Sequence, residues 1–218
     1  MRSTRPKAAL KRWIGQAFLR SAGWKMSGER PPIDRYVMIA APHTSNWDMP
    51  FMLAMAFVYD IPVRWMGKHT LFSPPFGPFF ERLGGIPIVR HRPGGVVGQM
   101  VEHFENNASL ALMVPAEGTR SHVDYWKSGF YHIARAADVP VVLSYLDFGK
   151  KVGGIGPAIE LTGDIAADMD KIRAFYAGME GLHPKNVGVI RLREEDVEAV
   201  LEHDAIDQAE IERLASNL

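Results

Sequence analysis

Short apolar runs separated by helical stretches are the feature that most constrains how this chain can fold. The runs are rich in aliphatic residues and are typical of buried strands: 37–41, 63–66, 86–89, 110–114 and 139–146. Residues 49–58, 96–106 and 129–137 lie between or beside them and are expected to form helices. Strands that alternate with helices predict an α/β layered domain.

Local signals refine this prediction at three places. Residues 72–80 are rich in Pro and aromatic residues, which predicts a loop or a short helix. Residues 153–156, Gly-Gly-Ile-Gly, follow no βα pattern, so we expect a hairpin turn there and not a dinucleotide-binding loop. Asp164 is expected to cap a helix over residues 165–179.

Composition excludes several kinds of site. The 218 residues suit one domain, and the absence of Cys excludes disulfides, thiolate metal sites and cysteine nucleophiles. The net charge is zero, but residues 1–30 hold eight basic residues and one acidic residue, whereas residues 191–218 hold three basic and nine acidic. A basic end of this kind predicts contact with something anionic, either nucleic acid or a membrane surface.

The N-terminal residues favour the membrane. Apolar residues recur there at helical spacing, whereas Lys and Arg lie largely off that face; the apolar set is Leu10, Trp13, Ile14, Ala17 and Phe18. We interpret residues 1–30 as a basic amphipathic membrane-surface helix anchored by Trp13, Phe18 and Trp24, and residues 31–218 as a single catalytic domain. The alternative is a surface helix that packs on its own domain. The longest apolar run, 49–59, is too short to span a bilayer.

Polar residues follow two of the apolar runs directly. His43 and Asp48 come after the run 37–41, and an imidazole can act as a base near neutral pH while a carboxylate orients it. The chain has neither a Gly-x-Ser-x-Gly elbow nor a Cys, so this pair is expected to activate a hydroxyl or water of the substrate. Two structurally bonded side chains are the simpler alternative, and a metal site has little support.

A second polar cluster, Glu117-Gly118-Thr119-Arg120-Ser121, follows the run 110–114. Its Arg120, together with Arg90 after the run 86–89, suits recognition of a phosphate group. Either arginine taken singly is equally typical of a surface ion pair.

Together these segments resemble the glycerolipid acyltransferase family, the lysophosphatidic acid acyltransferases and their relatives. His43 to Asp48 matches the family's His-x4-Asp motif, and Glu117 to Ser121 matches its third motif. The run Gly85 to Arg90 is similar to the second motif, and Val139 to Val142 is similar to the fourth. The resemblance covers roughly residues 35–150 and implies a mixed, mostly parallel central sheet flanked by helices.

The resemblance also implies the chemistry. His43 would deprotonate the hydroxyl of a lysophospholipid, with 1-acylglycerol 3-phosphate the first acceptor to expect, and Asp48 would orient the imidazole. The acyl group would come from acyl-CoA or acyl-carrier protein as a substrate, with no cofactor and no metal. The acceptor phosphate would be bound by a set of residues that Lys68 assists: Arg90, Glu117, Gly118, Thr119 and Arg120.

The same resemblance implies a peripheral protein on the cytoplasmic face of an anionic membrane, with no nucleic-acid partner. Pro42 stands where the family commonly has Asn, which keeps a different acceptor open, such as a lyso-ornithine-type lipid. A non-catalytic membrane-surface binding protein is the third alternative.

Overall fold

The computed structural model describes residues 5–89, 92 and 94–197. Its strands are β1 (Lys25–Ser27), β2 (Arg35–Ala41), β3 (Val63–Lys68), β4 (Gly85–Ile88), β5 (Leu110–Pro115), β6 (Val141–Asp147) and β7 (Val152–Ile159). Its α-helices are α1 (Arg5–Ser21), α2 (Asp48–Tyr59), α3 (Gly77–Arg82), α4 (Gly95–Glu105), α5 (Gly129–Ala137) and α6 (Ile165–Tyr176). Short 3-10 turns follow β3 and α6, at His69–Phe72 and Pro184–Asn186.

The strands form one seven-stranded sheet in the order β1-β7-β6-β2-β5-β3-β4. All neighbours are parallel except β6 and β7, which form an antiparallel hairpin. The predicted mixed, mostly parallel sheet is therefore confirmed. The two central strands, β2 and β5, are buried along almost their whole length, as expected for parallel strands that helices cover on both faces.

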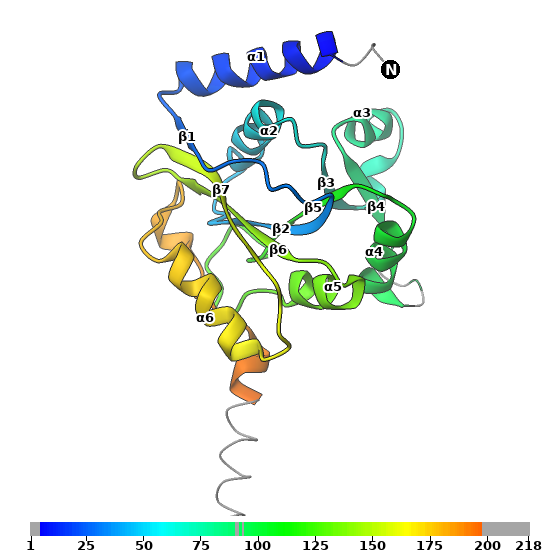
Figure 1. The fold of residues 1–218 in the computed structure, drawn as a ribbon, viewed down its shortest axis with the longest axis vertical. Coiled ribbons are helices and arrows are strands. Elements are labelled where there is room, and N and C mark those ends of the chain that lie inside the picture. The colour runs from blue at the N-terminus through cyan, green and yellow to red at the C-terminus, as the bar shows by residue number, and fades with distance from the viewer. Residues whose placement is uncertain (1–4, 90–91, 93, 198–218) are drawn as a thin grey trace, which may run out of the picture.

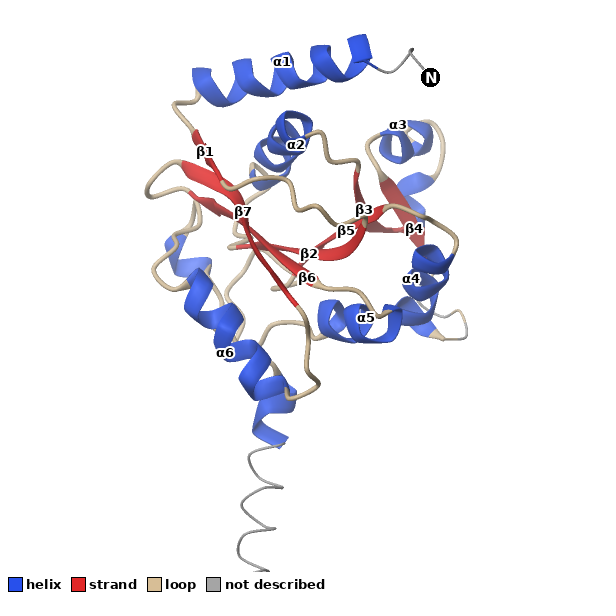
Figure 2. Ribbon diagram, in the orientation of Figure 1, coloured by secondary structure: helices blue, strands red, loops and turns tan. Residues whose placement is uncertain are grey.

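Helices cover both faces of this sheet (Figures 1 and 2). Alternate residues of β2 point to opposite faces: Val37 and Ile39 join the core under α4, α5 and α6, whereas Tyr36 and Met38 join the core under α2. Helix α1 lies outside α2 as a further layer (Figure 1), and Leu19 packs with residues of α2 in a third apolar cluster.

Most predicted elements lie within a few residues of their expected bounds, and Asp164 caps α6 as predicted, with its side chain accepting from the Ala167 N–H. The prediction for residues 153–156 was wrong in position. They lie inside β7, and the hairpin turn precedes them at residues 148–151. The glycines allow close packing, because a Cβ on Gly154 would come within 1.9 Å of the Ser27 carbonyl on β1, and one on Gly153 would meet Met55.

The boundary expected after residue 30 also differs from the structure. Strand β1, residues 25–27, pairs in parallel with β7 and is therefore part of the sheet. Trp24, expected to be a membrane anchor, is 7% exposed and packs against the rings of Phe51 and Phe148. Phe18 is half-buried against Phe51.

Candidate active site

Neighbouring parallel strands bring the two polar clusters together. Strands β2 and β5 run side by side in register, with Ala40 opposite Pro115. His43 follows the carboxyl end of β2 and Glu117 follows the carboxyl end of β5, so the two clusters lie at the same edge of the sheet. This edge is where ligands bind in open α/β sheets.

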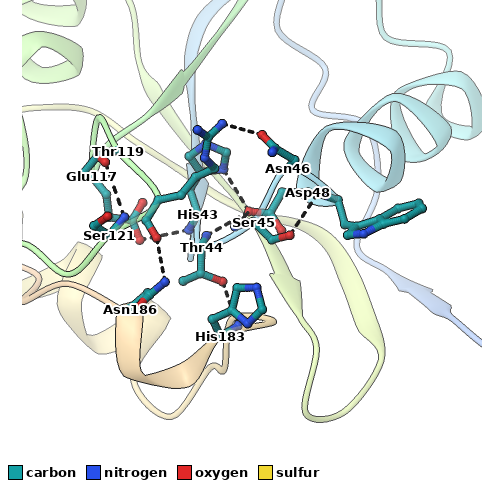
Figure 3. A network of polar contacts seen from close by, with 12 residues as sticks. His43, Thr44, Ser45, Asn46, Asp48, Glu117, Thr119, Ser121, His183 and Asn186 are labelled. Atoms are coloured by element: carbon teal, nitrogen blue, oxygen red, sulfur yellow. Dashed lines mark hydrogen bonds and ion pairs between the residues drawn. The ribbon is translucent and has the colours of Figure 1, made fainter.

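His43 and Asp48 form a hydrogen-bonded pair, as their spacing predicted. The His43 Nδ1 atom lies 2.9 Å from Asp48 Oδ2; the imidazole is 22% exposed, whereas the carboxylate is 2% exposed (Figure 3). The same carboxylate oxygen accepts the backbone N–H groups of Thr44 and Ser45, at 2.9 and 3.0 Å. A carboxylate only accepts hydrogen bonds, so Nδ1 carries the proton and Nε2 has a free lone pair.

Glu117 is buried next to the backbone of His43. Its side chain is 1% exposed, and its Oε1 accepts the backbone N–H of His43 at 3.0 Å. Burial raises the pKa of Glu117, an effect that the bond from His43 only partly offsets. The Glu117 side chain therefore holds the backbone that carries His43.

The rest of this cluster is exposed. Arg120 Nη1 lies 2.5 Å from Asn46 Oδ1, so the guanidinium reaches the loop between His43 and Asp48. Gly118 has a positive φ of 67°, and a Cβ there would lie 2.8 Å from Lys127. Thr119 Oγ1 accepts the Ser121 N–H at 3.4 Å. Arg120 is thus the cation that the structure brings next to the His43 loop.

Lys68 and Arg90 are the two other residues predicted to help bind the phosphate. Lys68 is exposed at the carboxyl end of β3, the strand beyond β5, at the same edge of the sheet. Arg90 lies outside the described residues, so its prediction stays open. The neighbouring Arg92 forms an exposed ion pair with Glu102 of α4.

An apolar cavity opens beside His43. Most of its lining residues are apolar, and the His43 ring and the Asp48 carboxylate are among the few polar groups that line it. It lies between the sheet and α2, and its lining runs from His43 and Asp48 past Met52 and Ala56 to Tyr59. Burial raises the pKa of Tyr59 to about 12, so its hydroxyl stays neutral and donates to the Ser27 carbonyl. Such a cavity suits a hydrocarbon chain.

Helix α1 turns its apolar face outward. Trp13 is 66% exposed, Leu10 and Ile14 are exposed too, and the side that packs on α2 carries Gly15 and Leu19. The Lys11 ammonium lies over the ring of Phe57. No helix among the described residues has the length and apolarity needed to cross a membrane.

A family model described as acyltransferase matches residues 25–144, which is more than half of the chain. The chain belongs to the acyltransferase family. The matched residues span β1 to β6 and include both polar clusters. Acyl transfer is therefore the activity that the geometry around His43 has to account for.

A solved structure supports the fold of this acyltransferase. The chain is similar to the 1-acyl-sn-glycerophosphate (LPA) acyltransferase PlsC from Thermotoga maritima, with a TM-score of 0.56 and 17% sequence identity. The similarity covers 84% of each chain. A search of curated proteins found no match.

The candidate site also includes residues that sequence reasoning missed. Asn46 accepts from Arg120, and Thr44 and Ser45 donate to Asp48. His183 and Asn186, which follow α6, contact the same two loops (Figure 3). Asn46, Thr44 and Ser45 lie inside the His43–Asp48 segment, so the motif that marked His43 and Asp48 could also have pointed to them. No pattern in the sequence marks His183 or Asn186.

Proposed function

We propose that this acyltransferase moves a fatty acyl group from acyl-CoA or acyl-carrier protein to the hydroxyl of a lysophospholipid, with 1-acylglycerol 3-phosphate as the first acceptor to test. The observation that carries the proposal is the His43–Asp48 pair in the lining of an apolar cavity. Thr44 and Ser45, the hydroxyl residues that follow His43, use their oxygens to accept backbone N–H groups within the site. A direct transfer between two substrates fits this arrangement.

In the proposed reaction, His43 Nε2 removes the proton of the acceptor hydroxyl as its oxygen attacks the thioester carbonyl. Asp48, bonded to Nδ1–H, stabilises the imidazolium that forms. The tetrahedral intermediate then collapses, the carbon–sulfur bond breaks, and the thiolate leaves and takes a proton from the imidazolium. The products are the diacyl lipid and the free thiol, and His43 returns to its neutral form.

The acceptor's phosphate is assigned to Arg120, because its guanidinium reaches the His43 loop from the neighbouring strand end. Gly118 and Thr119 shape the loop that carries Arg120, and Lys68 and Arg90 remain proposed contributors. For Glu117 we propose a positioning role in place of phosphate binding. A buried carboxylate beside the phosphate would repel it, whereas the bond to the His43 N–H keeps the base in place.

The cavity under α2 is assigned to the donor's acyl chain. It begins at His43, where the thioester carbon has to lie, and its lining is mostly apolar along its length, as a hydrocarbon requires. Placing the chain there leaves the thioester headgroup and the acceptor outside, next to Arg120.

Helix α1 is assigned to the membrane. Its exposed apolar side chains and the basic charge of residues 1–30 suit the interface of an anionic bilayer, where a lysophospholipid resides. Phe76 and Phe79, on or next to α3, are further exposed apolar side chains. Because acyl-CoA and acyl-carrier protein are cytosolic, the proposed location is the cytoplasmic face, as a peripheral protein.

The test is an acceptor panel. Purified protein is incubated with radiolabelled palmitoyl-CoA or palmitoyl-carrier protein and with lysophosphatidic acid, other lysophospholipids and a lyso-ornithine lipid. We expect labelled phosphatidic acid from the wild type and none from His43→Ala, with both proteins equally folded by circular dichroism.

Other results would change the proposal in defined ways. Product from the lyso-ornithine lipid alone would replace the acceptor but keep the chemistry. Vesicle binding without acylation of any acceptor would favour a non-catalytic surface protein. Full activity of His43→Ala would overturn the mechanism.

A further inference from the structure

Residues 180–187, which we call the C-terminal strap, connect the two loops of the candidate site. The strap follows α6 and lies outside the residues that the family model matches. Its bonds to the two loops join residues 139 and 66 positions apart in sequence. In Figure 3 the strap carries His183 and Asn186 alongside the loops of Thr44 and Glu117.

One end of the strap holds the loop of the base. The His183 N–H donates to Thr44 Oγ1 at 3.1 Å, and Thr44 is buried. Gly181 packs against the same side chain so closely that a Cβ would lie 2.5 Å from Thr44 Oγ1. The Thr44 N–H donates to Asp48, which in turn bonds His43. A continuous set of contacts therefore runs from the strap to the imidazole.

The other end of the strap holds the loop of the arginine. The Asn186 Nδ2 group donates to the Arg120 carbonyl at 3.0 Å. A second bond lies next to it: His122, two residues after Arg120, bonds through Nδ1 to the Val187 carbonyl at 2.8 Å. The guanidinium of Arg120 in turn donates to the side chain of Asn46, which lies between His43 and Asp48. The base and the cation are thus each tied to one short segment.

We infer that the C-terminal strap sets the separation between His43 and Arg120, with Thr44 and Asn186 as positioning residues. The inference rests on the proposed function, because it takes His43 as the base and Arg120 as the phosphate ligand. Loops that follow strand ends have few local constraints. Two bonds join these loops directly, from the His43 N–H to Glu117 and from Arg120 to Asn46, and the strap adds a separate link to each loop. A displacement of 1 Å in such a site can reduce the rate by roughly a hundredfold.

The test replaces the two side chains that form these hydrogen bonds by side chains of similar size. Thr44→Val removes the acceptor for His183, and Asn186→Asp removes the donor to Arg120. We expect Thr44→Val to lower kcat by roughly ten- to a hundredfold with little change in the acceptor KM. We expect Asn186→Asp to raise the acceptor KM by about tenfold, the loss of about 1.4 kcal/mol of binding. Thr44→Ser keeps the oxygen and should restore kcat.

Asp164→Ala is the matched control. It removes a hydrogen bond of similar energy at the start of α6, away from both loops. This variant should lose thermal stability and keep kcat and KM per folded molecule. If Thr44→Val and Asn186→Asp behave in the same way, the strap only stabilises the fold and the inference is wrong. If the wild type acylates no acceptor in the panel, the proposed function fails instead, and the two failures are distinguishable.

Discussion

Asp48→Asn separates the two tasks that this carboxylate performs. Its Oδ2 accepts three hydrogen bonds, from His43 Nδ1 and from the Thr44 and Ser45 N–H groups. Its Oδ1 is buried and has no hydrogen-bond partner among the described residues. The substitution keeps the shape, removes the charge, and puts either an NH2 group at the unpartnered position or one against three donors.

The expected loss of stability follows from these contacts. A hydrogen bond to a charged group contributes about 1.5–3 kcal/mol and a neutral one about 0.5–1.5, so the two backbone bonds lose about 2 kcal/mol together. An unpaired buried NH2 group costs about 1–3 kcal/mol more. A total of about 3–5 kcal/mol lowers Tm by roughly 6–20 °C for a chain of this size. The rate should fall further, about a thousandfold or more, because the imidazolium loses its counter-charge.

Asp168→Asn provides the control, because Asp168 has a similar set of contacts away from the site. It is fully buried, and its Oδ2 accepts from Thr162 N–H, Gly163 N–H and the Tyr131 hydroxyl. We expect it to lose comparable stability and keep kcat. The assay is acylation at saturating substrates, at a temperature where thermal unfolding shows every variant folded. A kcat of Asp48→Asn within tenfold of the wild type, or an equal loss in both variants, would refute the reasoning.

Three further predictions concern the pH dependence, the cavity and the membrane. Burial raises the pKa of Glu117 in the folded state, so the stability tied to its protonated form is present at low pH and lost as pH rises above about 4.5. The free energy of unfolding of Glu117→Gln should therefore rise relative to that of the wild type between pH 4 and pH 8, as measured by urea unfolding. An equal difference between the two proteins at both pH values would contradict this. Ala56→Leu narrows the cavity two helical turns beyond Asp48, so we expect activity with palmitoyl-CoA to fall by about tenfold relative to activity with decanoyl-CoA. An unchanged ratio of the two activities would mean that the acyl chain binds elsewhere. Trp13→Ser should weaken partition into anionic vesicles by about tenfold in a sedimentation assay without changing Tm, because the ring is exposed; unaltered binding would remove α1 from the membrane contact.

The sequence was a good guide wherever a local pattern has one structural meaning. Apolar runs and helical stretches predicted the elements of the sheet and its helices, because buried parallel strands need continuous apolar residues. The His43–Asp48 pair was predictable for a similar reason, since both residues lie in one loop after a strand. The resemblance in the two motifs was sufficient for the family.

Errors arose where distant residues decide the environment. Residues 153–156 suggested a turn, yet Gly154 lies in a strand that pairs with β1. The glycine is needed there because β1 approaches too closely for a side chain. Trp24 suggested a membrane anchor, yet Phe51 and Phe148 bury it. In each case the neighbours that decide the outcome come from other parts of the chain, and local composition carries no information about them.

The sequence by itself determined the α/β class, the family and the pairing of His43 with Asp48, since each depends on residues close together in the chain. Only the tertiary structure decided that Glu117 supports the backbone of His43, that the apolar face of α1 points outward, and that a segment after α6 joins the two loops. Those properties depend on which strands become neighbours and on which side of a helix is covered. Contacts between residues far apart in sequence set both.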